Sequence, residues 1–130
     1  VVLPKHCDHY GHLNVRYYAH FFDVGCFRMW HHIGIKQTDL KQNNMGAVVA
    51  NISIDFIHEI TVGQLMEIRG VWRHMGNKSM SHEQRLFNVD TGVHCATQKT
   101  LEVYFNMEKR CSAPMPENLR EKVKANVMTL

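Results

Sequence analysis

The sequence lacks any long apolar run, and this absence limits what the protein can be. No segment of its 130 residues approaches the ~18 consecutive apolar residues that a membrane-spanning helix needs. The start of the chain also lacks the apolar core of a secretory signal. We therefore expect no membrane partner. The chain begins at Val1 rather than at a methionine, so what precedes it stays open.

Proline is scarce, with 3 residues, and no repeat or low-complexity stretch interrupts the chain. The apolar fraction of 45% is ordinary for a folded protein and excludes a disordered chain. This length suits one compact domain. We expect a single domain over residues 1–130.

The 4 cysteines form no C-x-x-C pair and have no regular spacing. This absence argues against a disulfide framework and against a structural zinc site. Free thiols fit a reducing compartment, so we expect the protein in the cytoplasm.

No stripe of positive charge is present either. The formal net charge is +3, and the 15 lysines and arginines are scattered along the chain. Proteins that bind nucleic acid usually concentrate such residues on one face. We therefore expect no nucleic-acid partner.

Histidine, in contrast, is abundant, with 10 residues, and the first ones cluster near the start. His6, His9 and His12 lie three residues apart in a segment that the sequence predicts to be a loop. A metal site needs ligands that converge in space, and regular spacing in a loop does not imply that geometry. We expect surface and pocket histidines, and no metal.

Residues 15–32 have the pattern of one long helix. Asn14 is a good N-cap, and apolar residues such as Tyr18 and Phe22 recur at helical spacing. Gly34 is a plausible stop signal. Residues 1–13 are predicted to be a loop, and residues 35–46 an exposed connection.

Residues 47–107 have the pattern of strands. Ile52, Ile54 and Phe56 alternate with polar residues, as expected of a sheet with one buried face. Turn signals at residues 61–63, 76–77 and 90–92 divide the region into four strands, which predicts an antiparallel meander. A short helix carrying Leu119 and Val123 should follow. The pattern is α+β, with the sheet covering or wrapping the long helix.

The densest set of reactive side chains lies in the loop before the long helix. Asp8 stands three residues before Gly11, and the loop leads into a helix start with unpaired amides and a positive dipole. A carbonyl oxygen placed there would be polarised. Asp8 could then act on an activated acyl group as nucleophile or as general base, although an aspartate near a turn is more often a structural cap.

Further segments accompany this motif in a fixed order over nearly the whole chain. The set comprises Asp8-His9-Tyr10-Gly11-His12-Leu13-Asn14, Arg16-Tyr17-Tyr18, Phe21-Phe22-Asp23, Ile54-Asp55-Phe56, Val62-Gly63, Met75-Gly76-Asn77-Lys78-Ser79, Ala96, Val103-Tyr104-Phe105 and Pro116 to Arg120. In this order the segments resemble the 4-hydroxybenzoyl-CoA thioesterase-like family of hotdog proteins.

The resemblance implies a hotdog fold, in which a curved antiparallel sheet wraps a long central helix. It implies hydrolysis of an acyl-CoA to free acid and CoA, with Asp8 as the catalytic carboxylate and the Val15 backbone amide polarising the thioester carbonyl. Members form homodimers or homotetramers with sites at subunit interfaces. No cofactor is expected, because CoA is part of the substrate.

Several other residues are candidates for substrate contacts. Gly11 belongs to the motif, and His12 and Tyr18 could shape the acyl pocket or orient Asp8. Lys78 and Ser79 follow a glycine turn and could meet CoA phosphates or the pantetheine arm. Further basic candidates for the nucleotide end are Arg73, Lys99 and Arg110.

Alternatives remain open at this point. A related branch places its carboxylate on the central helix, where Asp23 is the only acid, so Asp23 is a secondary candidate. The chain could be a non-catalytic acyl-CoA-binding module or a hotdog dehydratase, which pairs a histidine with an acid. His12 and Asn14 stand where the best-studied branch has a short apolar segment. We therefore do not assign the aromatic substrate of that branch to this chain. The identity of the acyl group stays open, and so does the choice between CoA and acyl carrier protein as its carrier.

Overall fold

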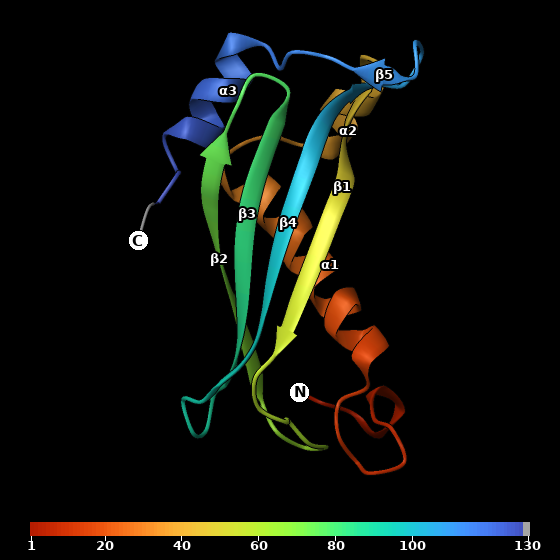
Figure 1. Cartoon of the computed structure of the whole chain (residues 1–130), viewed down its shortest axis with the longest axis vertical. Coiled ribbons are helices and arrows are strands. Elements are labelled where there is room, and N and C mark those ends of the chain that lie inside the picture. The colour runs from red at the N-terminus through yellow and green to blue at the C-terminus, as the bar shows by residue number, and fades with distance from the viewer. Residues whose placement is uncertain (129–130) are drawn as a thin grey trace.

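The computed structural model describes residues 1–128, in which one long helix packs against one antiparallel sheet (Figure 1). The helix is α1, and the sheet contains four long strands and one short one. The elements are a 3₁₀ turn at Pro4–His6, α1 at Val15–His32, α2 at Gln37–Gln42, β1 at Met45–Phe56, β2 at Met66–Met75, β3 at Ser79–Asn88, β4 at His94–Asn106, β5 at Cys111–Ser112 and α3 at Glu117–Lys124.

Helix α1 has the bounds that the sequence predicts. The Asn14 side chain accepts a hydrogen bond from the Arg16 amide at 3.2 Å, which caps the first turn. Tyr18, Phe22 and Trp30 are buried on the face that meets the sheet. Within residues 1–128, no helix combines the length and apolar character that crossing a bilayer requires.

The predicted meander is wrong for β1. The order of the four long strands is β1-β4-β3-β2, so β2, β3 and β4 are consecutive neighbours, whereas β1 pairs with β4 and not with β2. The turn at residues 61–63 does not close a hairpin, because its backbone bonds to the N-terminal segment instead. The Leu13 amide donates to the Ile60 carbonyl at 2.8 Å and the Gly63 amide donates to the Val2 carbonyl at 2.8 Å.

The expected exposed connection at residues 35–46 is also partly wrong. It contains the short helix α2, and Leu40 on that helix is buried in the core. One apolar residue in a polar segment is a weak sequence signal. Its burial depends on β1 and α1, which α2 contacts.

The core consists of two apolar clusters. One centres on Trp30 and Trp72, and the other on Phe22 and Leu86. Polar side chains of β3 and β4 that face α1 are buried in the middle of the sheet. This group, called the polar belt below, consists of His82, Gln84, Gln98, Thr100 and Glu102.

Strand β1 is only partly covered. Ile52 and Phe56 share one face, as predicted, and their partners Thr100 and Ala96 on β4 are buried under the helix. Yet Ile52 and Phe56 are exposed, and only Ile54 is half-buried. Among residues 1–128, no strand pairs with the outer edge of β1. The apolar face of β1, which the sequence predicts to be buried, is therefore exposed in a single chain.

Candidate active site

The loop before α1 is built around the Asp8 carboxylate. Its oxygen Oδ1 accepts hydrogen bonds from the amides of Tyr10 at 2.9 Å and His12 at 3.2 Å. Among residues 1–128, every hydrogen bond to this carboxylate ends on Oδ1. One oxygen thus performs the structural capping role, which leaves Oδ2 for a water or a substrate. The side chain is half-buried.

Gly11 gives the loop its shape. It adopts a φ of +80°, a conformation that favours glycine, and its amide donates to the Asp8 carbonyl at 3.1 Å. Its carbonyl accepts from the Val62 amide at 3.2 Å. The loop is therefore fixed both internally and against the connection between β1 and β2.

The chain enters α1 directly after this loop. Asn14 occupies the Arg16 amide, whereas the Val15 amide is a first-turn donor that the helix itself cannot satisfy. The Val15 side chain is exposed, which fits the expectation that any role of Val15 is through its backbone amide. A free first-turn amide at the positive end of the helix dipole favours a developing oxyanion.

His12 and Tyr18 both lie near this loop. The His12 Nε2 atom is 3.1 Å from a carboxylate oxygen of Glu59. Tyr18 is buried with its ring against Phe56, and burial, followed by the charges of Cys95, Asp8 and Glu59, raises the pKa of its phenol. Tyr18 therefore stays a neutral hydroxyl beside the carboxylate.

The structure does not bring Lys78 and Ser79 to Asp8 within one chain. They lie at the turn between β2 and β3, at the end of the sheet opposite the N-terminal loop (Figure 1). Ser79 pairs with Val103 through the backbone, and the Lys78 carbonyl accepts from the Tyr104 amide at 2.8 Å.

The other basic candidates are dispersed. Arg73 forms an ion pair with Glu83, with 2.9 Å between Nη2 of Arg73 and Oε2 of Glu83. Lys99 is exposed on β4, and the Arg110 guanidinium lies over the Phe105 ring. No residue of this set shares a hydrogen bond or an ion pair with Asp8 among residues 1–128. Asp23, the secondary candidate, is exposed on α1.

A cavity of about 640 Å³ lies between α1 and β2. Phe21 and Met29 of α1, Ile68 and Trp72 of β2, and Gln84 belong to its lining. None of the predicted substrate contacts lines it. We base the site on the Asp8 loop because the loop, and not this cavity, joins a free carboxylate oxygen to a free helix amide.

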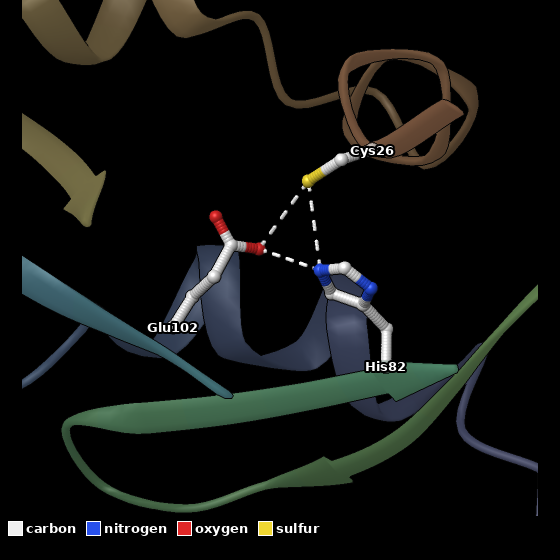
Figure 2. Close-up of side chains that lie close together, drawn as sticks. All are labelled: Cys26, His82 and Glu102. Carbon is white, nitrogen blue, oxygen red and sulfur yellow. Dashed lines mark hydrogen bonds and ion pairs between the residues drawn. The ribbon is translucent and has the colours of Figure 1, made fainter. Parts of the chain in front are cut away.

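One further cluster, at one end of the polar belt, was not predicted from the sequence. Cys26 of α1, His82 of β3 and Glu102 of β4 point toward one another (Figure 2). The Nε2 atom of His82 lies 2.9 Å from Glu102 Oε2 and 3.5 Å from the Cys26 sulfur. Burial, and then the Glu102 carboxylate, raise the pKa of the Cys26 thiol.

Alternation in β3 offered no clear signal, because both of its faces carry polar residues, the face with His82 among them. The sequence alone did not say that α1 covers this face. The His82 ring is fully buried, so this histidine–acid pair is not open to a substrate and does not favour the dehydratase alternative.

Comparison with family models identifies the family. A model described as the thioesterase-like superfamily matches residues 2–123. No curated protein matches the chain.

Solved structures with the same fold include two named thioesterases and one hypothetical protein. Gentisyl-coenzyme A thioesterase BH1999 is 19% identical with a TM-score of 0.82, covering 95% of each chain. SAV2348 from Staphylococcus aureus, solved with CoA, is 17% identical with a TM-score of 0.90, covering 99% of this chain and 83% of its own. A 1,4-dihydroxy-2-naphthoyl-CoA thioesterase from Synechocystis is 12% identical with a TM-score of 0.84, covering 95% and 90%. With a family match over nearly its whole length and the helix-and-sheet arrangement of these structures, the chain belongs to the thioesterase-like superfamily and has the hotdog fold.

Proposed function

We propose that this protein is an acyl-CoA thioesterase that hydrolyses its substrate to a free acid and CoA. The observation that carries the proposal is the Asp8 loop. Among residues 1–128, one carboxylate oxygen accepts from two backbone amides and the other has no partner, and the Val15 amide in the first turn of the following helix has none either. This arrangement needs no Ser-His-Asp triad.

In the proposed reaction the thioester carbonyl oxygen lies at the Val15 amide. Asp8 either takes a proton from a water, whose oxygen attacks the carbonyl carbon, or attacks that carbon itself. Both routes place negative charge on the same oxygen, where the amide and the helix dipole stabilise it. The C–S bond then breaks, and the CoA thiolate leaves and takes up a proton. In the second route water hydrolyses the resulting anhydride.

The substrate class is supported by the relatives. One structural neighbour is solved with CoA, and two are named as thioesterases of aromatic acyl-CoA substrates. The identities of 12 to 19% do not carry an acyl preference to this chain. We propose CoA as part of the substrate and no separate cofactor. The 4 cysteines are free thiols, which supports a cytoplasmic location.

We further propose a homodimer formed through β1. Its outer edge has no partner strand within residues 1–128, and Val49, Ile52 and Phe56 leave an apolar face uncovered beside it. If two copies pair β1 antiparallel, the sheet continues across the two-fold axis. The Lys78 end of one copy then lies at the same end of the sheet as the Asp8 loop of the other. Lys78 and Ser79 could thus serve the partner's site.

The central test compares the wild type with Asp8→Asn on a panel of aliphatic and aromatic acyl-CoAs, detecting released thiol. Asparagine keeps the Oδ1 acceptor for the Tyr10 and His12 amides, so the loop should stay intact while the reactive charge is lost. We expect kcat to fall by at least about 100-fold, with the unfolding temperature nearly unchanged.

Asp23→Asn is the matched control, because it removes an exposed carboxylate from the same region. It should leave kcat within about twofold of the wild type. Loss of activity in Asp23→Asn and not in Asp8→Asn would move the catalytic role to the helix. Binding of acyl-CoA by a folded wild type without thiol release, on CoA and acyl-carrier-protein substrates alike, would replace the enzyme with a binding module.

A further inference from the structure

The cluster of Cys26, His82 and Glu102 brings three types of metal-binding side chain together in the protein interior (Figure 2). The residues come from α1, β3 and β4, and β3 and β4 are paired neighbours at the centre of the sheet. Their positions are therefore fixed by the packing of the helix on the sheet, and not by a flexible loop.

The separations of the three ligand atoms fit a small tetrahedral ion. The sulfur of Cys26 lies 3.5 Å from His82 Nε2 and 3.6 Å from Glu102 Oε2, and Nε2 and Oε2 are 2.9 Å apart. With Zn–S near 2.3 Å and Zn–N or Zn–O near 2.0 to 2.1 Å, tetrahedral ligand atoms lie roughly 3.3 to 3.6 Å from one another. An ion would need only a slight separation of His82 and Glu102.

The hydrogen bonds of the cluster leave it incompletely satisfied. Trp30, His82 and Cys26 all direct a polar atom at the same oxygen, Glu102 Oε2. The other ring nitrogen of His82, Nδ1, is buried and has no hydrogen-bond partner among residues 1–128. No second hydrogen bond fixes which nitrogen carries the proton, so Nε2 can present its lone pair to an ion held between the three ligand atoms.

Charge also favours a divalent ion here. A thiolate at Cys26 and a carboxylate at Glu102 together offset two positive charges, and His82 binds as a neutral ring. Glu83, the acid next to His82, is paired with Arg73 and Arg85. No arginine or lysine forms an ion pair with Glu102 within residues 1–128. A bound divalent ion would make the buried site neutral overall, which lowers the cost of burying its charges.

We propose that Cys26, His82 and Glu102 bind a thiophilic divalent cation, for which zinc is the best match. One thiolate, one imidazole and one carboxylate suit zinc, whereas magnesium and calcium prefer oxygen ligands alone. On binding, the Cys26 thiol releases its proton to solvent and the His82 proton moves from Nε2 to Nδ1. A water or the second oxygen of Glu102 completes four-fold coordination. The sequence had predicted no metal, because the three ligands are separated by 56 and 20 residues along the chain.

This site is separate from the proposed catalytic loop. Val15 and Cys26 are eleven residues apart on α1, which corresponds to about 16 Å along the helix axis. We assign the ion a role in clamping α1 to β3 and β4 and none in thioester hydrolysis. A failure of the metal proposal would therefore leave the thioesterase proposal unaffected. Metal binding is measured by cobalt absorption, whereas thioesterase activity is measured by thiol release.

Cobalt(II) titration of the full chain tests the proposal. Chelator-treated protein is titrated with Co²⁺ and followed by absorption, because a thiolate ligand gives a charge-transfer band that surface histidines cannot give. We expect the band to saturate at one equivalent, together with the visible bands of tetrahedral cobalt, and Zn²⁺ to displace it. Cys26→Ser should abolish the band and weaken zinc binding by more than about 100-fold.

Two other cysteines provide matched controls. Cys7 lies beside His6 and His9 and could bind cobalt adventitiously, and Cys111 is exposed. Cys7→Ser and Cys111→Ser should keep the charge-transfer band. A band lost in either control and kept in Cys26→Ser would overturn the proposal, as would a wild type with no thiolate-to-cobalt band.

A second measurement has the wild type as its main readout, which does not depend on the folding of any variant. Bound zinc should raise the unfolding temperature of the wild type relative to chelator-treated protein, because the ion binds only the folded state. Glu102→Gln keeps the shape of the side chain and removes its charge, and it should reduce this upward shift. An unchanged wild-type unfolding temperature at saturating zinc would contradict the proposal.

Discussion

The α-carbon of Gly25 on α1 faces the side-chain oxygen of Gln84 on β3 so closely that a methyl group at residue 25 would overlap it. Gln84 is fully buried, and its Nε2 atom donates to the Phe22 carbonyl at 2.8 Å. Glycine at this position therefore leaves room for the buried Gln84 side chain between the helix and the sheet.

Gly25→Ala should destabilise the protein by about 1–3 kcal/mol, because the added methyl group displaces Gln84 from its hydrogen bond. This loss should occur even though alanine gains about 1 kcal/mol over glycine in helix propensity. Urea unfolding measures the difference. In a Gln84→Ala background the methyl group has room, so the same substitution should be neutral or stabilising. Equal destabilisation in both backgrounds would show that the contact is unimportant.

Gly11→Ala should reduce activity more than stability. At a φ of +80° alanine is strained by about 1–2 kcal/mol, and relief of that strain would move the Asp8 carboxylate. We expect kcat/KM for the preferred acyl-CoA to fall by about tenfold or more. Gly92 has a φ of +73° in the turn between β3 and β4, and an added methyl group meets no atom within 4 Å at either glycine. Gly92→Ala should carry the same strain and keep full activity.

His6 should make the fold sensitive to acid. Burial, followed by the charges of Lys5, His20 and the N-terminal amine, lowers the pKa of His6 from 6.5. Its Nδ1 atom also accepts a hydrogen bond from the Leu3 amide at 3.0 Å, which requires an unprotonated nitrogen. The unfolded chain then binds a proton more readily than the folded one. The stabilisation is complete above pH 6.5 and is lost progressively as the pH falls below that value.

His6→Asn tests this linkage, because the amide oxygen can accept from the Leu3 amide and does not titrate. The stability of the variant relative to the wild type should rise as the pH falls from about 7 to about 5. Thermal unfolding over this range is the measurement. His9→Asn, at an exposed histidine of the same segment, should follow the wild-type curve. Parallel curves for wild type and His6→Asn would refute the linkage.

Charges on the uncovered face of β1 should dissociate the proposed dimer. Val49 and Ile52 are 45% and 46% exposed in the single chain, so Val49→Asp or Ile52→Asp should be tolerated by the fold. In the dimer the same charges would be buried without a partner. Sedimentation velocity should show a shift to the monomer. Val89, 49% exposed in the turn between β3 and β4, gives the control Val89→Asp, which should stay dimeric. A monomeric wild type would end the proposal.

Local signals sufficed for the helix and for the loop before it. The cap at Asn14, the helical spacing of apolar residues and the glycine at residue 11 are signals that act over a few neighbouring residues. The structure confirms α1 and the turn at Asp8. The family match supports the hotdog fold that the ordered motifs implied. The role of Asp8 in catalysis stays a prediction, because it depends on a substrate.

The sequence by itself determined where α1 and the four long strands form and placed Asp8 in the loop before the helix, because capping, periodicity and turns are local. Only the tertiary structure decided that β1 pairs with β4, that α2 buries Leu40, and that Cys26, His82 and Glu102 converge. Each of these depends on contacts between distant residues, and the alternation along a strand does not say which face the helix covers. The physical reason is that burial depends on how the helix and the sheet pack together. The residue pattern of a strand does not identify its buried face before the position of the helix is known.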